Sequence, residues 1–260
     1  MSDLKLINLR TNNLLTNQKL SLTKLQEIVE AKAEEVFGLR VIASNYIINK
    51  NDNEYIETLA IDENYNIVII EYRNGKFSKV INKSIIFIDY IKDNISQFKM
   101  LVNDKIGVEE GQQVKFNPRI IVIGDDFNKY DEVAIKQMHK ISIDLIKYQM
   151  FDKTHLLFEK NYQSLTVNHQ LFTYEFSNRD HFSIYRLIND FVLSLGDEVV
   201  ETGIDQYLSY RKIRNFMFVT FTNGVEISLR IGNKYKVYML KNERDFNKMQ
   251  GLIEQAYDEN

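Results

Sequence analysis

The sequence contains no cysteine, no tryptophan and a single proline among its 260 residues. The absence of cysteine excludes disulfides, thiolate catalysis and zinc sites built on cysteine ligands. No apolar run approaches the roughly 18 residues that a membrane-spanning helix needs. Among the longest are Ile67–Ile70 and Ile85–Ile88, and the first residues lack the apolar region of a signal peptide. We therefore expect no contact with a membrane and no secretion, and we expect the protein to be cytoplasmic.

The residues that are present suit a folded chain of one large domain or two ordinary ones. Apolar residues make up 44% and charged residues 27%, which favours a buried core with a solvated surface over disorder. The net charge of −3 does not indicate a nucleic-acid-binding protein overall, although a local basic patch is compatible with it. The four histidines (His139, His155, His169 and His181) are scattered and lack the spacing of metal ligands.

The spacing of apolar residues predicts two units of secondary structure. In the first we expect a helix at Ser21–Phe37, strands at Arg40–Ile48, Tyr55–Ile61 and Ile67–Arg73, a helix from a Ser78 cap to about Val102, a strand at Arg119–Ile123, a helix at Asp131–Ile143, and strands at Asp144–Tyr148 and His155–Glu159. In the second we expect a helix at His181–Leu195, strands within Met217–Tyr238, and a helix at Asp245–Tyr257. This order predicts an α/β fold. A mixed sheet flanked by helices would occupy 1–163, a linker 164–178, and a small α+β domain 179–260.

Two glutamates stand out in the expected hairpin of Tyr55–Ile61 and Ile67–Arg73. If the hairpin is centred on Asn64, Glu57 faces Glu71 at about 5 Å between Cβ atoms, where like charges are destabilising. Arg73 then lies on the same face as Glu71, because side chains alternate along a strand. Two carboxylates among isoleucines need a compensating cation, either a side chain or a hard divalent ion such as Mg²⁺. The alternative is a half-exposed hairpin with solvated glutamates, and a slip of one residue would separate the pair.

Short phrases in a fixed order surround this hairpin. They are Phe-Gly-Leu-Arg-Val-Ile-Ala-Ser (Phe37–Ser44), Ile-Glu-Thr-Leu-Ala-Ile-Asp-Glu-Asn (Ile56–Asn64), Val-Ile-Ile-Glu-Tyr-Arg (Val68–Arg73), Val-Ile-Asn-Lys-Ser-Ile-Ile-Phe-Ile-Asp-Tyr (Val80–Tyr90), Pro-Arg-Ile-Ile-Val-Ile-Gly-Asp-Asp-Phe (Pro118–Phe127) and Leu-Ile-Lys-Tyr (Leu145–Tyr148). This order resembles the NucS-like endonuclease domains of the PD-(D/E)XK nuclease superfamily. The C-terminal part, ending Leu-Ile-Glu-Gln-Ala-Tyr (Leu252–Tyr257), is similar to an uncharacterised domain often fused behind them.

The resemblance implies a restriction-endonuclease-like fold, a homodimer, and metal-dependent hydrolysis of DNA phosphodiester bonds. In the family motif, an acid on one strand is followed by Glu-x-Lys on the next. Glu57 and Glu71 would then hold Mg²⁺ or Mn²⁺, and Arg73 would contact the scissile phosphate. This chain departs from the motif, because Glu57 replaces the usual aspartate and Arg73 replaces a lysine that arginine does not imitate.

Two further groups of residues are implied near the metal. Lys83 stands where the family commonly has glutamine, and we expect it to supply the missing lysine; the alternative is a solvated residue in a first helical turn. Glu30 or Glu34 matches the helix glutamate that the superfamily often places by the metal, or else both belong to a solvated helix face. Asp125 and Asp126 are compatible with either a site or a turn.

A basic and aromatic segment lies between Tyr207 and Lys241. Its cations include Arg211, Lys212, Arg214, Arg230, Lys234 and Lys236, with Glu226 as its one acid, and its rings are Tyr207, Tyr210, Phe216, Phe218, Phe221, Tyr235 and Tyr238. Cations that follow a phosphate backbone and rings that stack on bases suit nucleic-acid binding. Alternatively, the rings form a sheet core and the cations its ordinary outer face.

We therefore expect a metal-dependent DNA endonuclease. One alternative is a catalytically degenerate module that binds nucleic acid with the same fold. Another is a protein-interaction component of a defence or repair system. Metal-dependent cutting separates the first hypothesis from the second, and salt-sensitive nucleic-acid binding separates the second from the third.

Overall fold

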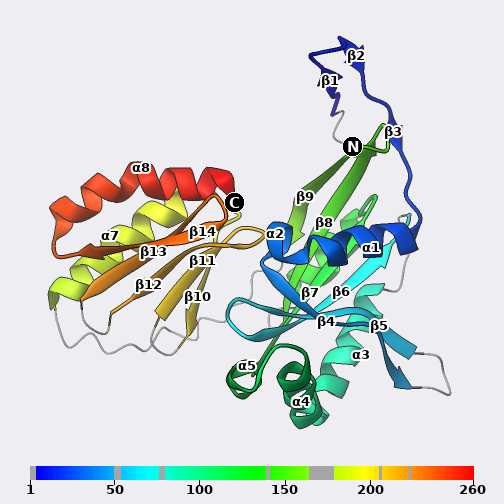
Figure 1. Cartoon of the computed structure of the whole chain (residues 1–260), viewed down its shortest axis with the longest axis horizontal. Coiled ribbons are helices and arrows are strands. Elements are labelled where there is room, and N and C mark those ends of the chain that lie inside the picture. The colour runs from blue at the N-terminus through cyan, green and yellow to red at the C-terminus, as the bar shows by residue number, and fades with distance from the viewer. Residues whose placement is uncertain are drawn as a thin grey trace. The chain divides into compact units, whose positions relative to one another are not determined.

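A computed structural model of the protein describes residues 4–49, 54–75, 80–138, 141–163, 179–204, 207–221 and 224–260 (Figure 1). The chain divides into two compact units. Unit 1 comprises Met1–Ala33 and Leu39–Thr166, and unit 2 comprises Glu34–Gly38 and Val167–Asn260. The expected linker, 164–178, lies outside the described residues. Within the described ranges, no helix has the length and apolar character needed to cross a membrane.

Unit 1 is built on a seven-stranded mixed sheet in the order β3-β8-β7-β6-β5-β4, with β9 paired to β8. The strands β4, β5 and β6 are antiparallel neighbours, whereas β6, β7 and β8 run parallel. The strands are β3 (Asn17–Gln18), β4 (Leu39–Asn49), β5 (Glu54–Asp62), β6 (Asn66–Arg73), β7 (Lys115–Gly124), β8 (Ser142–Phe151) and β9 (His155–Gln163), and a separate hairpin joins β1 (Ile7–Asn8) to β2 (Asn13–Leu14).

Helices flank this sheet, which confirms the predicted α/β class. They are α1 (Leu22–Ala31), α3 (Val80–Asp93), α4 (Ile95–Lys105), α5 (Val108–Gln113) and α6 (Lys129–Lys136), while α2 (Ala33–Phe37) follows α1. All eight residues of β6 are buried, as are residues 119–124 of β7. Near-continuous burial of Ile and Val is what central strands covered on both faces require. The α3 and α4 side contains a large core in which Phe87, Ile91 and Phe98 pack against Ile69 and Val122.

Three expected helices have different bounds in the structure. The helix starting after the Ser21 cap splits into α1 and α2 near Lys32, and the one expected up to Val102 splits into α3 and α4 at Asn94. Asn94 donates its side-chain amide to the Tyr90 carbonyl, a local bond that competes with helical geometry. The proposed Ser78 cap lies outside the described residues. The helix expected to reach Ile143 ends at Lys136, because Ile143 pairs in parallel with Ile120 as part of β8.

Unit 2 is an α+β unit whose described residues form a five-stranded antiparallel sheet with helices packed against it, in agreement with the predicted class. The strands follow in chain order: β10 (Val200–Ile204), β11 (Tyr207–Arg211), β12 (Asn215–Thr220), β13 (Val225–Ile231) and β14 (Lys234–Leu240), with helices α7 (Arg179–Ser194) and α8 (Glu243–Glu259). The expected strands correspond to β12, β13 and β14, whereas β10 and β11 were not predicted. Ile188 of α7 and Ile253 of α8 share one core with alternate residues of the strands, such as Ile227 and Leu229.

Candidate functional site

The candidate site lies where β5 and β6 separate. Their pairs run from Ile61↔Ile67 to Thr58↔Ile70, which is the register expected from the sequence. The ladder between them stops there. Beyond this point β5 continues along β4 and β6 continues along β7, up to Arg73↔Gly124. The next opposed positions, Glu57 and Glu71, therefore stand at the fork of two diverging strands.

Each glutamate accepts a hydrogen bond from the backbone across the fork. Glu71 Oε1 accepts from the Glu57 N–H at 3.1 Å, and Glu57 Oε2 accepts from the Tyr72 N–H at 2.6 Å. The carboxylates thus take the place of the ladder, because backbone donors in a buried sheet need a partner. This reciprocal arrangement holds two like-charged groups together in a defined orientation.

Burial makes both carboxylates reluctant to ionise. The Glu71 side chain is 1% exposed. Burial, and then the charge of Glu57, raise the pKa of Glu71 to about 7, although Lys83 and the Glu57 N–H oppose the shift. Burial also raises the pKa of Glu57, against the opposing effects of the Tyr72 N–H and Lys83. The fork therefore favours the uptake of positive charge, either protons or a cation.

Lys83 reaches this fork from α3. Its Nζ lies 3.0 Å from Glu71 Oε2, and its side chain remains 33% exposed. The ammonium also lies 4.9 Å from the ring centroid of Tyr55 and 5.0 Å from that of Phe87, within the range of cation–π attraction. Lys83 is thus both held against a carboxylate and accessible to solvent.

Arg73 has other partners. Its Nε and Nη2 donate to the Gly75 carbonyl at 3.1 and 2.9 Å, and its Nη1 lies 3.1 Å from the Asp131 carboxylate. The guanidinium also stacks 5.0 Å from the Phe127 ring centroid, and the side chain is fully buried. The expected contact with a scissile phosphate would require these contacts to open. In the structure, Arg73 instead ties the end of β6 to α6.

The two helix glutamates do not join the pair. Glu30 lies on the opposite face of the sheet, where its carboxylate accepts from Thr58 Oγ1 at 2.6 Å and from Ser44 Oγ at 2.7 Å. Thr58 in turn hydrogen-bonds the Tyr72 hydroxyl at 3.0 Å. Glu34 is exposed on α2. Across the ranges that the structure describes, no three His, Cys, Asp or Glu residues are grouped to hold a metal ion.

The pair of carboxylates nevertheless fits Mg²⁺ or Mn²⁺. Hard divalent cations prefer oxygen ligands, and Mg²⁺ commonly takes one or two carboxylates together with waters and substrate phosphates. Two adjacent carboxylates, the buried one of Glu71 and the partly exposed one of Glu57, both have raised pKa values and supply such oxygens. Glu57 and Glu71 are the residues that would hold the ion.

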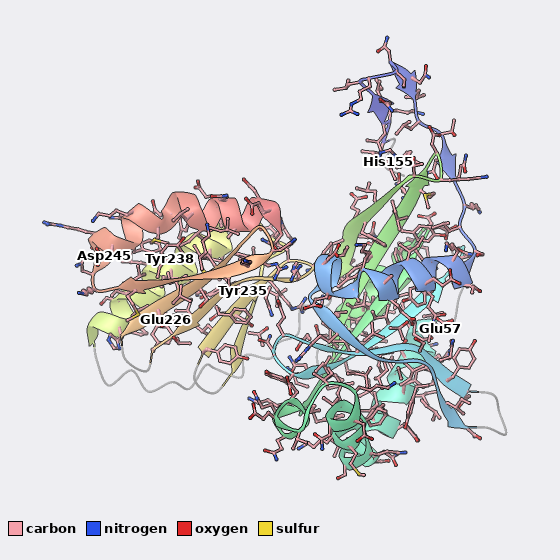
Figure 2. All side chains as sticks on the ribbon, viewed as in Figure 1. Glu57, His155, Glu226, Tyr235, Tyr238 and Asp245 are labelled. Atoms are coloured by element: carbon pink, nitrogen blue, oxygen red, sulfur yellow. The ribbon has the colours of Figure 1, made fainter. Side chains whose placement is uncertain are left out.

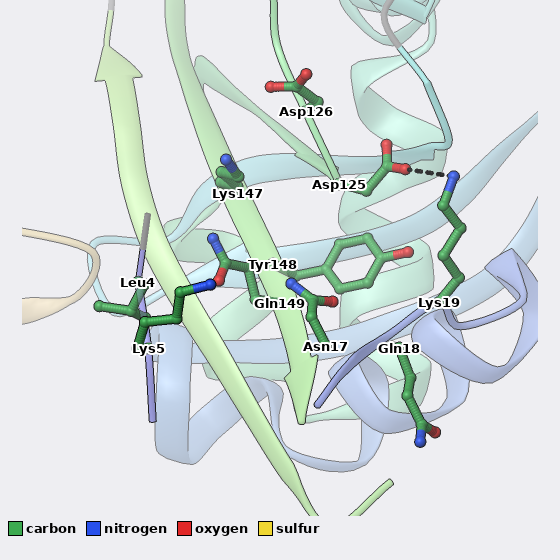
Figure 3. Close-up of a pocket in the computed structure, with 10 residues that line it drawn as sticks. All are labelled: Leu4, Lys5, Asn17, Gln18, Lys19, Asp125, Asp126, Lys147, Tyr148 and Gln149. Atoms are coloured by element: carbon green, nitrogen blue, oxygen red, sulfur yellow. Dashed lines mark ion pairs between the residues drawn. The ribbon is translucent and has the colours of Figure 1, made fainter. Parts of the chain in front are cut away.

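A polar basin of about 430 Å³ opens close to the end of β6 (Figure 3). It is lined by Leu4, Lys5, Asn17, Gln18, Lys19, Asp125, Asp126, Lys147, Tyr148 and Gln149. The strand β9 occupies one edge of β8, and β7 and β3 pair successively with the other. Along β8, the pairing with β7 stops at Lys147 and the pairing with β3 starts only at Met150. A gap therefore remains on this edge of β8 between the two strands.

Hydrogen bonds connect this basin to the chain that leaves β6. Asp125 accepts from the Gly75 N–H at 2.7 Å and lies 3.7 Å from Lys19 Nζ. The Tyr148 hydroxyl donates to Asn74 Oδ1 at 3.1 Å. Sequence reasoning identified Asp125 and Asp126 but missed the lysines of the basin, because residues 5, 19 and 147 share no spacing that indicates proximity.

The six cations predicted to bind nucleic acid in unit 2 do not form one exposed surface. Lys234 and Lys236 are exposed on β14, whereas Arg211, Arg214 and Arg230 are buried. Lys212 donates to the Tyr257 carbonyl at 2.9 Å and lies 4.0 Å from the centroid of its ring. Among the histidines, His155 is exposed at the start of β9 and lies well apart from Glu57 (Figure 2). His139 and His169 lie outside the described residues.

Comparison with known proteins adds little to this geometry. No family model matches the sequence, and no curated protein matches it. A solved structure titled "Structure of EndoMS-dsDNA2 complex" is similar over 50% of this chain and 47% of its own, with 12% sequence identity and a TM-score of 0.29. This chain thus matches about half the length of that protein.

Proposed function

We propose that unit 1 is a Mg²⁺- or Mn²⁺-dependent nuclease that hydrolyses phosphodiester bonds of DNA. The observation that carries the proposal is the fork, where Glu57 and Glu71 are held together by reciprocal backbone hydrogen bonds with Lys83 against Glu71. Two like charges held together at a partly buried position cost stability, so the raised pKa values of both glutamates favour a functional site over a structural one. The resemblance to PD-(D/E)XK nucleases selects phosphodiester hydrolysis among metal-dependent reactions.

The side chains have separable roles in this proposal. A bound Mg²⁺ or Mn²⁺ would supply Lewis-acid stabilisation of the phosphate and a more acidic water. Glu57 and Glu71 hold that ion. Lys83, already oriented by Glu71 and partly exposed, donates to phosphate oxygens on which negative charge develops. Arg73 positions the chain after β6 through Gly75 rather than contacting substrate.

The basin supports the proposal as a place for the substrate strand. Three lysines, Lys5, Lys19 and Lys147, line a cavity next to Asp125. Asp125 in turn accepts a hydrogen bond from Gly75, which lies two residues beyond the end of β6. Ammonium groups attract a phosphate backbone without regard to sequence. We assign these three lysines to phosphates that flank the scissile bond.

The test is a panel of single-stranded, duplex, mismatched and branched DNA with Mg²⁺, Mn²⁺ or chelator. Wild type should cut at least one substrate with metal and none with chelator, and Glu57→Gln and Glu71→Gln should each lose at least about tenfold in rate. Glu27→Gln is the matched control, because Glu27 is an exposed glutamate on α1. Calorimetric titration with Mn²⁺ should show binding that Glu71→Gln loses. Equal cutting by Glu71→Gln and wild type would refute the assignment.

The second candidate is a module that binds DNA without cutting it. Arg73 favours this alternative, because the motif lysine is replaced by a residue enclosed between Gly75, Asp131 and Phe127. This alternative predicts salt-sensitive DNA binding with no cleavage of any substrate in either metal.

A further inference from the structure

Side chains from both faces of the sheet bond to the backbone of Glu57 at the fork. On the face that carries the site, Glu71 Oε1 accepts from the Glu57 N–H at 3.1 Å. The helix α1 packs on β5 and β6 from the other face, which we call the back face (Figure 1). From there Gln26 donates its side-chain amide to the Glu57 carbonyl at 2.7 Å. Gln26 thus supplies a donor at the position where the ladder with β6 has ended.

Glu30, one helical turn further along α1, orients the amide of Gln26. Gln26 Nε2 donates to Glu30 Oε1 at 3.0 Å, a contact between residues four apart on one helix face. The Glu30 carboxylate also accepts from Thr58 Oγ1 of β5 at 2.6 Å and from Ser44 Oγ of β4 at 2.7 Å. Donors from one helix and two strands therefore determine the direction of this carboxylate, and through it that of the Gln26 amide.

The network returns to the fork through Thr58 and Tyr72, which precede or follow the two site glutamates in the chain. Thr58 has one hydroxyl proton and donates it to Glu30, so the Tyr72 hydroxyl donates to Thr58 across 3.0 Å. The Tyr72 N–H in turn donates to Glu57 Oε2 at 2.6 Å. Thr58 and Tyr72 are buried, where a hydrogen bond is costly to leave unmade. The backbone and the carboxylate of Glu57 are therefore held by one connected network.

We propose that Gln26 and Glu30 are positioning residues, which hold Glu57 against Glu71 from the back face of the sheet. Partners that orient a metal ligand without touching the ion typically change metal affinity by 10- to 100-fold. The inference rests on the proposed nuclease function, and it adds that α1 determines how well the pair of carboxylates accepts a cation. Glu30 acts through Gln26 and Thr58, and not as the metal ligand that the family resemblance implies.

Hydrogen exchange of the full chain in chelator, followed by NMR, tests the positioning without metal. Gln26→Leu is similar in size but has no donor for the Glu57 carbonyl. The amides of Glu57 and Tyr72 donate across the fork, so their exchange should become at least about tenfold faster in this variant. The amide of Ile121, in the buried part of β7, should exchange as in wild type. Gln97→Leu is the matched control, because Gln97 is exposed on α4.

Calorimetric titration with Mn²⁺, without DNA, tests the effect on the site. Gln26→Leu and Glu30→Leu should each raise the Mn²⁺ dissociation constant about 10- to 100-fold. Glu30→Gln should keep the wild-type affinity, because its amide retains an oxygen for Gln26 and Thr58 and offers a donor to Ser44. Glu27→Leu and Glu27→Gln are the matched controls on an exposed part of α1.

The outcomes separate positioning from the other roles that these residues could have. Unchanged exchange at the fork, or unchanged Mn²⁺ affinity, in a folded Gln26→Leu protein would overturn the proposal. So would a loss of Mn²⁺ affinity in Glu30→Gln as large as in Glu30→Leu, which would make Glu30 a ligand. Exchange that rises at Ile121 as much as at Glu57 would assign Gln26 to general stability.

Two further arrangements keep the test decisive. If Gln26→Leu does not fold, Gln26→Asn replaces it, because the shorter side chain cannot reach both Glu30 and the Glu57 carbonyl. A wild-type protein that binds no Mn²⁺ would remove the nuclease proposal, whereas the exchange experiment in chelator would still decide the positioning role.

Discussion

Lys83 and Glu71 form an ion pair that joins α3 to the fork between β5 and β6, with 3.0 Å between Nζ and Oε2. Arg73, which stands on β6 where the resemblance to PD-(D/E)XK nucleases implies a lysine, is meanwhile held by Gly75 and Asp131. A cation from a neighbouring helix thus stands at the carboxylates, where the resemblance implies a lysine from the strand itself. Unlike arginine, lysine is a compact charge that can also take part in proton transfer.

Replacing Lys83 tests this substitution of one cation for another. We expect Lys83→Met to lower kcat at least about tenfold, roughly 1.4 kcal/mol of barrier, with little change in KM. Lys92→Met is the matched control, because Lys92 is an exposed lysine in the last turn of the same helix. Steady-state kinetics on the substrate found in the DNA panel measures both constants. Full activity in Lys83→Met would remove Lys83 from the reaction.

Replacing Arg73 should act on stability. The Arg73–Asp131 pair is buried, so Arg73→Met leaves a carboxylate without its partner and should lower the free energy of unfolding by about 3–5 kcal/mol. Urea denaturation measures the loss, and the double variant Arg73→Met/Asp131→Leu should recover part of it because no uncompensated charge remains. Gly124→Ala should also destabilise, because its Cβ would lie 2.7 Å from Arg73 Cγ. An Arg73→Met protein of wild-type stability that cannot cut would instead restore Arg73 to the reaction.

The raised pKa of Glu71 has a defined effect on stability without metal. In the folded protein this pKa is about 7, against an ordinary value of 4.5, so the folded state binds the proton more tightly than the unfolded state. The stability that the protonated carboxyl contributes is complete below about pH 4.5 and is lost as the pH rises through about 7. In wild type, the free energy of unfolding should fall by up to about 3 kcal/mol over this pH range because of Glu71. This part of the pH dependence should be missing in Glu71→Gln. Thermal unfolding in chelator between pH 5 and 8 measures it, and equal pH slopes in the two proteins would contradict the assignment.

The hairpin that carries the site could be predicted from sequence because two local signals agree. Alternation fixes which side chains share a face, and the turn at Asp62–Asn66 fixes the register. Asp62 accepts hydrogen bonds from the backbone of Asn64 and Asn66, which stabilises that turn. The opposition of Glu57 and Glu71 therefore follows from residues within 20 positions of each other.

Other features depend on contacts that sequence spacing does not encode. The direction of the Arg73 guanidinium is set by Asp131 and Phe127, more than 50 residues away in the chain. Ile143 fits a helical period but joins β8, because pairing with β7 overrides local preference. The basin arises from the successive pairing of β7 and β3 with one strand. The sheet of unit 2 is completed by β10 and β11, whose short alternation was too weak to be recognised.

The basin lysines give a prediction about binding. Lys19→Gln and Lys147→Gln should each weaken duplex binding at all sequences and reduce the log–log salt slope by roughly 0.9, the value for one lost phosphate contact. Anisotropy titrations in chelator at several salt concentrations measure both quantities. Lys24→Gln, an exposed lysine at the start of α1, should leave them unchanged. Unaltered slopes in the basin variants would place the DNA elsewhere.

The N-terminal hairpin bears on the homodimer that the family resemblance implies. Figure 1 shows β1 and β2 standing apart from the sheet of unit 1, and Ile7, Leu9 and Leu14 are 54, 90 and 56% exposed. Large apolar side chains so exposed in one short hairpin indicate an interaction surface, since burying each stabilises by about 1.5–3 kcal/mol.

We propose that this hairpin packs on a second copy of the chain. Wild type should then be a dimer by light scattering at micromolar concentration. The dimer dissociation constant of Ile7→Ser/Leu9→Ser should rise at least about 100-fold, because losing two buried side chains costs at least about 3 kcal/mol and a 100-fold change in affinity equals about 2.8 kcal/mol. Val108→Ser, an exposed apolar residue on α5, is the control and should leave the mass unchanged. A monomeric wild type, or a double variant with an unaltered dimer constant, would exclude this hairpin from any such contact.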